Sequence, residues 1–299
     1  SDHTLEAQGR LTHPLRYDAT SDHYQPVSWD SAFAEIGAEL KAMDDPDQVV
    51  FYMSGRAALE TAYMYGLLAR LYGTNNLPDS SNMCHESTSV ALPESIGVPV
   101  ATVTLNDLEH TDGLFFFGQN TGTSSPRMLH ELQAARERGA EIVTFNPLRE
   151  RGLERFVNPQ SPREMLTPDS TVISTQYHQL AIGGDMAAIA GMCKALFAMD
   201  DLAIAEGRQR VLDVAFIEQH THGFEAFEAR IRSYTWEQLE RRSGLTRAAM
   251  EAAATAYARC ERVIAPYGMG LTQHRHGVQT IQMLVNLLLL RGNMGKEGA

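Results

Sequence analysis

Two short apolar segments with a helix-like segment between them constrain the fold of this chain more than any other feature. Residues 113–117 and 141–145 are rich in Phe, Ile and Val, and each is typical of a buried strand. Between them, Ser125 and Pro126 predict a helix start, and Gly139 predicts its end. Two strands joined by one crossover helix pair in parallel, with the helix on one face. The sequence therefore predicts an α/β fold built on a parallel sheet.

A second, incomplete α/β unit is indicated nearer the N-terminus. Residues 49–53 predict a buried strand, and residues 57–72 predict a helix capped by Gly73. Ser28 predicts the start of an earlier helix. We therefore expect Rossmann-like parallel sheets flanked by helices, in an irregular lead-in segment (1–28), a partial α/β domain (29–78) and a dinucleotide-binding α/β domain (79–299).

The C-terminal part of the chain contains further helical periodicity. Apolar residues recur there at three- and four-residue steps, which indicates helices. The expected elements are a long Pro-rich loop at 150–170, a strand at 172–173, a helix at 186–199, mostly helical chain at 213–260, a strand at 262–266 and a buried helix at 278–290. These elements make the C-terminal domain the more complete of the two.

Charge and composition narrow the class of function. The chain has 299 residues, of which 43% are hydrophobic, and a net charge of −12. It has no Lys/Arg cluster of the kind that binds nucleic acid, and its longest apolar run, at 287–290, is far too short to span a membrane. The three cysteines lie far apart, which argues against a disulfide framework and favours a reducing compartment. We therefore expect a cytoplasmic protein with no nucleic-acid partner and no membrane segment in this chain.

Cys84 is the residue that most suggests chemistry. It follows a turn-rich run and precedes a helix-like stretch, so it is expected in the loop before a helix. The positive end of the helix dipole favours a thiolate at such a position. A thiolate is a nucleophile or a soft metal ligand, whereas the alternative is a small, inert buried cysteine.

Four polar or glycine-rich loops follow strand-like segments. They are residues 54–56, 118–120, 146–149 and 267–270. In an open α/β sheet, ligands bind outside the carboxyl ends of the strands, where glycines and helix N-termini receive phosphate. The four loops together predict a nucleotide-like ligand, although each alone is also typical of an ordinary strand-to-helix turn.

The sequence departs from a simple NAD enzyme. The dinucleotide motif GxGxxG needs a second glycine that the loop from Gly118 to Gly122 does not have at the required place. The residue after the next strand should be acidic to bind a ribose hydroxyl, and it is Asn146. Both departures weaken the NAD hypothesis.

Two other chemistries have partial support. Cys84 and His85 are suited to a Cys-His hydrolase, but adjacent side chains do not face each other on a helix, so the base would come from elsewhere. The histidines at 220–222 and 274–276 are spaced closely enough for zinc, yet no cysteine or carboxylate lies at the spacing of a zinc site. Solvated loop histidines explain these pairs better.

Five segments, in this order, resemble motifs of the molybdopterin oxidoreductases, and most closely the formate dehydrogenase-like branch. They are Ser81 to Glu86 around Cys84, the loop Gly118 to Pro126, the strand and turn Ile142 to Arg149, Gly183 to Ala187, and Tyr267 to Lys296. The resemblance covers essentially the whole chain. It implies that the chain is a central fragment of a longer catalytic subunit, which by itself would hold the pterin poorly and be inactive.

The resemblance also implies a cofactor, molybdenum held by two molybdopterin guanine dinucleotides. Cys84 would then ligate the metal, and His85 would accept a proton beside it. The residues implied to bind the cofactor are Arg56, Gly118, Asn120, Thr123, Asn146, Arg149, Gly184, Asp185, Met269, Gln273 and His274. The family's iron–sulfur cluster and its catalytic arginine are expected only in segments outside this chain.

We therefore expect two-electron redox chemistry at molybdenum in the full-length protein. The first candidate substrate is formate or a similar small molecule, with an electron-transfer partner. The alternatives are a non-enzymatic nucleotide-binding scaffold of the same fold and the Cys-His hydrolase. The sequence leaves the choice of molybdenum or tungsten open.

Overall fold

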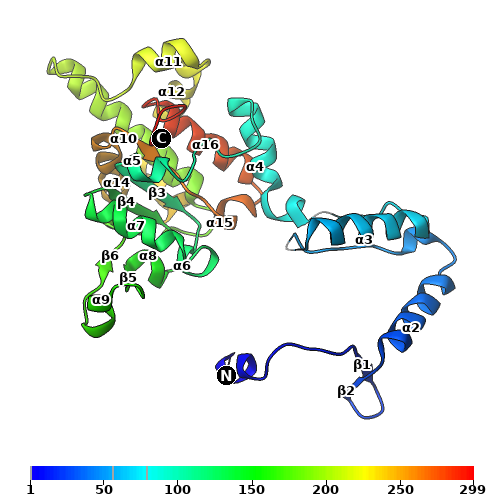
Figure 1. The fold of residues 1–299 in the computed structure, drawn as a ribbon. Coiled ribbons are helices and arrows are strands. Elements are labelled where there is room, and N and C mark those ends of the chain that lie inside the picture. The colour runs from blue at the N-terminus through cyan, green and yellow to red at the C-terminus, as the bar shows by residue number, and fades with distance from the viewer. Residues whose placement is uncertain (1, 56, 79) are drawn as a thin grey trace. The chain divides into compact units, whose positions relative to one another are not determined.

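The computed structural model describes residues 2–55, 57–78 and 80–299. The chain divides into two compact units, Ser1–Ser80 and Ser81–Ala299. Figure 1 shows that the central sheet belongs to the second unit.

A four-stranded parallel sheet forms the centre of the second unit. Its order is β7-β4-β3-β8, where β7 is Gln176–His178, β4 is Glu141–Phe145, β3 is Gly113–Phe117 and β8 is Val263–Ile264. The pair β3 and β4 lies in register from Gly113↔Glu141 to Phe117↔Phe145, with the bounds that the sequence predicts. All five residues of β3 are buried, which is expected of a parallel strand covered on both faces.

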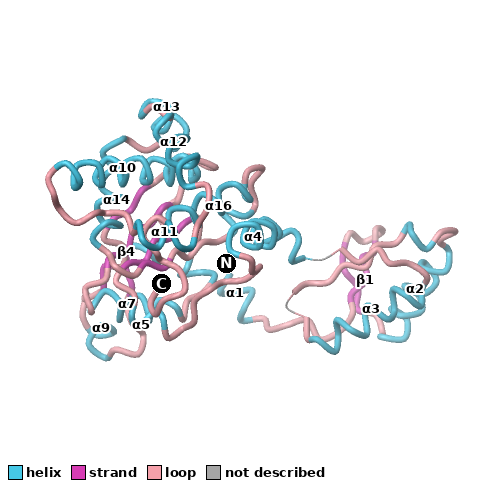
Figure 2. The backbone as a smooth tube through the Cα atoms, turned by 90° about the horizontal axis from the view of Figure 1, so that it is seen from above, coloured by secondary structure: helices cyan, strands magenta, loops and turns pink. Residues whose placement is uncertain are grey.

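Side chains of β3 alternate between two apolar cores. Phe115 and Phe117 pack in a cluster with residues of α10 (Asp185–Ala205), α14 (Arg247–Arg259) and α16 (Gly277–Leu289). Leu114 and Phe116 pack on the other face with residues of α5 (Asp107–His110), α7 (Met128–Glu137) and α8 (Arg151–Glu154). Helices therefore cover both faces of the sheet, as Figure 2 shows from above.

Smaller elements complete this unit. They are α4 (Ser80–Ile96), α6 (Thr121–Ser124), β5 (Arg155–Phe156), α9 (Pro162–Leu166), β6 (Thr171–Val172), α11 (Val214–His220), α12 (Phe224–Ser233), α13 (Trp236–Ser243) and α15 (Met269–Thr272). None of the described helices combines the length and the apolar character needed to cross a lipid bilayer.

The sequence prediction was wrong in three places in this unit. The crossover contains two helices, α6 and α7, with Ser125 and Pro126 between them, because the Asn120 side chain caps an earlier turn at Thr123 N. The expected loop at 150–170 contains α8, β5 and α9. The strand β7 was not predicted, because three residues are too few to show a period.

The first unit is helical, with one antiparallel hairpin. It consists of α1 (Asp2–Ala7), β1 (Leu15–Asp18), β2 (His23–Pro26), α2 (Trp29–Ala42), a 3₁₀ turn (Pro46–Gln48) and α3 (Leu59–Tyr72). The predicted caps are confirmed, since Ser28 Oγ accepts from Ser31 N and Gly73 adopts a left-handed conformation. The lead-in segment is more regular than expected, because it carries α1 and the hairpin.

The strand expected at 49–53 is absent from the described structure. No described segment forms a ladder with these residues, and an isolated strand cannot satisfy its backbone. Phe51 N donates to Asn76 O, and the Phe51 ring is buried beside Tyr65 and Tyr72. Val50 is 61% exposed, so the segment lacks the burial expected of a central parallel strand.

Leu132 tests the packing of α7 on the sheet. Its side chain is completely buried, and the Leu132→Ala variant is expected to lose about 2–5 kcal/mol of unfolding free energy through lost contacts and a cavity. The matched variant is Leu202→Ala on α10, where the side chain is 53% exposed and the loss should stay below about 0.5 kcal/mol. Urea unfolding measures both, and equal losses would contradict this packing.

Candidate functional site

The loops that follow β3 and β8 meet at the carboxyl edge of the sheet. Gly270 N donates to Gly118 O at 3.1 Å, and Phe117 forms a parallel bridge with Tyr267. A Cβ atom built on Gly270 would lie 2.5 Å from the Gly118 Cα atom, and Gly118 has φ +54°. The two backbones can approach this closely only because both residues are glycines.

The loop after β4 joins the same edge. Asn146 is buried, and its Nδ2 atom donates to Gln119 O at 3.3 Å. Asn120 Oδ1 accepts from Thr123 N, and Asn120 Nδ2 donates to Glu150 Oε2 at 2.7 Å. The hydrogen bonds therefore hold the loops after β3 and β4 together.

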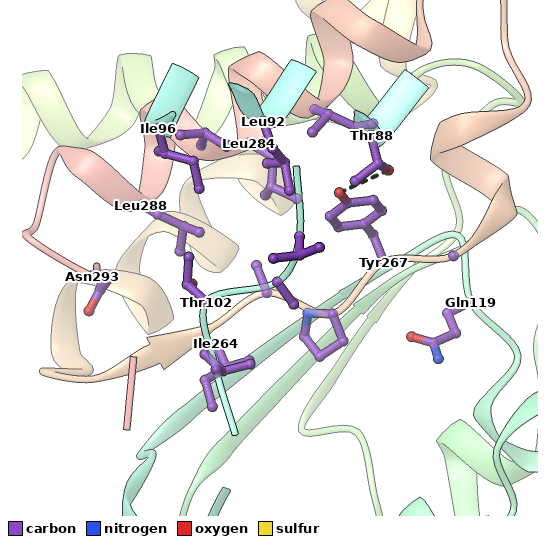
Figure 3. Close-up of a pocket in the computed structure, with 18 of the residues that line it drawn as sticks. Thr88, Leu92, Ile96, Thr102, Gln119, Ile264, Tyr267, Leu284, Leu288 and Asn293 are labelled. Carbon is purple, nitrogen blue, oxygen red and sulfur yellow. Dashed lines mark hydrogen bonds between the residues drawn. The ribbon is translucent and has the colours of Figure 1, made fainter. Parts of the chain in front are cut away.

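Two buried polar atoms at this edge have no hydrogen-bond partner among the described residues. They are Gln119 Oε1 and Thr121 Oγ1. Buried polar atoms are nearly always hydrogen-bonded, so an unpaired one calls for an explanation such as a ligand. Gln119 also lines the large cavity next to this edge (Figure 3).

Asp185 starts α10 just beyond β7 and is only 4% exposed. Burial raises the pKa of its carboxyl to about 6, and nearby His274 opposes the rise. Gly184, at the N-cap, is enclosed by backbone, because a built Cβ atom would lie within 2.9 Å of three carbonyl oxygens. Asp185 is therefore held in place by a rigid turn, and ionising it there is costly.

Cys84 lies inside α4, next to a kink. The backbone of His85 is non-helical, with φ −141° and ψ 19°, so α4 consists of two helical segments. The sequence predicted that Cys84 lies in a loop before a helix, and this prediction was wrong. Cys84 lies next to a kink within α4, with helical residues on both sides. Cys84 is partly exposed and His85 is exposed.

Cys84 and His85 line a cavity of about 650 Å³. Most of its wall is aliphatic and comes from α4, residues 100–108, β8 and α16. Figure 3 shows Leu92 and Ile96 of α4 on the same wall as Leu284 and Leu288 of α16, with the Tyr267 hydroxyl bonded to Thr88. No Lys or Arg is among the described residues that line it.

Hydrogen bonds connect the Cys84 segment to α15 and to Gln273, the residue that follows it. Thr272 Oγ1 donates to Cys84 O at 2.6 Å, and Gln273 Nε2 donates to Met83 O at 3.0 Å. Since α15 contains Gly270, which contacts Gly118, this connection joins Cys84 to the loop after β3. The structure thus brings four of the five motif segments into one connected group and places the fifth, with Asp185, beside His274.

The other predicted residues contribute less directly. Arg149 donates to Glu154 Oε1 and its guanidinium lies over the Tyr177 ring. Thr123 and Met269 are exposed, and Met269 lines the cavity. Arg56 lies outside the described residues. Sequence reasoning missed Gln119, Thr121 and Thr272, because only burial and contacts distinguish them from ordinary polar residues.

Comparison with known proteins gives the family. Residues 10–299 match the family model described as "Molybdopterin oxidoreductase". The chain belongs to the molybdopterin oxidoreductase family. It is 53% identical over 298 residues to Protein YdeP of Escherichia coli (strain K12). The aligned region covers 100% of this chain and 39% of that protein. It is 29% identical over 295 residues to Formate dehydrogenase H of the same organism, covering 97% and 37%.

The structural comparison gives the same fold. Acetylene hydratase from Pelobacter acetylenicus superposes with a TM-score of 0.66 at 20% identity, over 97% of this chain and 36% of that one. The chain thus spans well under half the length of these relatives. At this identity the likeness establishes the fold, which agrees with the predicted α/β class.

Gly270 tests the contact between the loops. The Gly270→Ala variant places a methyl group against Gly118, so we expect a loss of about 1–3 kcal/mol of unfolding free energy. The control is Gly37→Ala inside α2, where a Cβ atom meets nothing within 4 Å and a small gain is expected. Thermal unfolding measures the stability of both variants. A Gly270→Ala variant as stable as the parent would contradict the close contact between Gly270 and Gly118.

The raised pKa of Asp185 predicts that the free energy of unfolding depends on pH. Its pKa is higher in the folded than in the unfolded chain, so the folded state binds the proton more tightly and stability falls as pH rises from about 4 to about 6. Asp185→Asn should therefore gain about 2–3 kcal/mol at pH 7 and nothing below pH 4. Urea unfolding at both pH values checks this, with exposed Glu218→Gln as the control.

Proposed function

We propose that the full-length protein is a molybdopterin-dependent oxidoreductase that carries out a two-electron reaction at a metal bound by two molybdopterin guanine dinucleotides. The observation that carries this proposal is the connected group of contacts at the sheet edge. Cys84 O accepts a hydrogen bond from Thr272 of α15, and Gly270 of the same short helix contacts Gly118. A soft ligand and a glycine-rich backbone edge therefore lie on one continuous frame.

The residues at this edge fit such a cofactor. Gln119 Oε1 and Thr121 Oγ1 are buried and unpaired among the described residues; the amide oxygen could accept a hydrogen bond, and the hydroxyl could accept or donate one. The Asp185 carboxylate suits guanine, whose N1–H and exocyclic amine are both donors.

Each protein group then has a simple role. When bound, the cofactor supplies the two-electron change and most of the metal's ligands. Cys84 would add one thiolate ligand, which suits a soft, sulfur-rich metal site. His85 is exposed next to Cys84 and could accept a proton that leaves the substrate.

Formate is the first candidate substrate, supported by the 29% identity to Formate dehydrogenase H. The described cavity lining has no Lys or Arg, so a carboxylate would need its cation from elsewhere in the full-length protein. We also propose an electron-transfer partner and a cytoplasmic location, since the free cysteines Cys84, Cys193 and Cys260 suit a reducing compartment.

The two alternatives make different demands. A nucleotide-binding scaffold would need the glycine-rich edge but not Cys84. A Cys-His hydrolase would need a base within hydrogen-bond reach of the Cys84 sulfur, and none of the described residues donates to or accepts from that atom. The geometry therefore favours the ligand role for Cys84.

Cys84→Ser tests the ligand role. We expect the parent full-length protein, made in a host that synthesises molybdopterin, to contain near-stoichiometric molybdenum or tungsten with pterin. The variant should lose at least about 90% of its redox activity while it keeps its fold, because a hydroxyl is a poor substitute for a thiolate ligand.

The matched control is Cys260→Ser. This thiol is buried, and its sulfur faces the carbonyls of Asp112 and Ala256, which a hydroxyl can also use. It should keep metal and activity. Elemental analysis, pterin fluorescence and circular dichroism measure the three properties. A parent protein free of metal and pterin would favour the scaffold.

A further inference from the structure

Thr272 and the segment around Cys84 exchange hydrogen bonds in both directions. Thr272 Oγ1 donates to Cys84 O at 2.6 Å, and Ser87 Oγ donates to Thr272 O at 2.7 Å. The partners are 188 and 185 residues apart in the sequence. Thr272 is only 8% exposed, so water competes little for these bonds.

Gln273 and Gly277 also contact the segment around Cys84. Gln273 Nε2 donates to Met83 O at 3.0 Å. Gly277, the first residue of α16, packs so tightly that a built Cβ atom would lie 2.7 Å from Thr272 O and 2.8 Å from Ser87 Oγ. The α4 kink, α15 and the start of α16 therefore meet at Thr272.

We call these hydrogen bonds of Thr272, Gln273 and Ser87 the Thr272 clamp. The clamp holds the chain next to the kink in α4. In a regular helix the backbone sets the direction of each side chain. The backbone of His85 departs from helical geometry directly after Cys84, so the helix does not fix the peptide group that joins these two residues. The hydroxyl of Thr272 bonds to the carbonyl of that peptide group.

We propose that Thr272 is a positioning residue that sets the orientation of Cys84 through this carbonyl. The inference rests on the proposed role of Cys84 as a metal ligand. Replacing the hydroxyl by a methyl group leaves the carbonyl without its buried donor, at nearly unchanged volume. The kink then opens more often, and the Cys84 thiol points in more directions.

Thiol alkylation tests the clamp without any cofactor. The full-length protein is made in a host that lacks molybdopterin, treated with iodoacetamide and analysed by mass spectrometry at each cysteine. In Thr272→Val we expect the Cys84 alkylation rate to rise about three- to tenfold, the effect of one lost net hydrogen bond. Buried Cys193 and Cys260 report global opening and should keep their parent rates.

Two further variants separate positioning from general stability. Thr272→Ser keeps the hydroxyl and should restore the parent rate at Cys84. Thr280→Val makes the same substitution at a buried threonine of α16, whose hydroxyl bonds within the helix to His276 O, and should leave Cys84 unchanged. An unchanged Cys84 rate in Thr272→Val overturns the proposal. So does an equal rise at all three cysteines, or a failure of Thr272→Ser to restore the rate.

If Thr272→Val does not fold, Ser87→Ala takes its place. It removes the reciprocal donor to Thr272 O, and the Cys84 rate should rise at least about twofold. An unchanged rate again overturns the proposal. Metal analysis of the parent protein decides the proposed function separately, because the alkylation experiment contains no cofactor.

Discussion

The close contact between Gly118 and Gly270 is the constraint on which the site depends. Gly118 is the first residue after β3, and Gly270 lies in α15, the short helix that follows β8. A side chain on either would separate the two backbones, since a built Cβ atom already falls within 2.6 Å of the other residue. Because α15 also holds the Cys84 carbonyl, the place of the thiol follows from a contact made at the sheet edge.

The site has local features that a stable fold alone does not require. Asp185 is buried at a cost that an asparagine would avoid, and Gln119 and Thr121 each leave a buried polar atom unpaired among the described residues. Costs of this kind concentrate where a protein binds a ligand, because the ligand later supplies the missing partner. This edge of the sheet is therefore better explained by binding than by stability.

The apolar cavity has a different character from this polar edge. Its wall is mostly aliphatic, with residues of α4, β8 and α16, and Cys84 and His85 are the only cysteine and histidine among the described residues that line it. Figure 3 shows the Tyr267–Thr88 hydrogen bond on the same side as the α4 wall. Cys84 and His85 thus line an apolar space with little capacity for charge, and Cys84 is hydrogen-bonded through its carbonyl to α15, which contacts the polar edge.

The strong local patterns were predictable. The strands at 113–117 and 141–145 form with the predicted bounds, because a continuous apolar run is what a strand buried on both faces needs. The start of α2 after Ser28 and the end of α3 at Gly73 follow from capping chemistry. The strand expected at 49–53 failed, because burial of Phe51 alone does not provide a neighbouring strand. The ordered motifs also pointed to Cys84, Asn146, Asp185 and the family before any contact was known.

The sequence by itself identified candidate residues for the chemistry and determined which short segments become strands and helix caps, since these depend on neighbours along the chain. Only the tertiary structure decided that Thr272 holds Cys84, that Gly270 crosses Gly118, and that Gln119 and Thr121 are unpaired in the described interior. Such facts depend on atoms more than a hundred residues apart, or on burial, and no local pattern encodes either one.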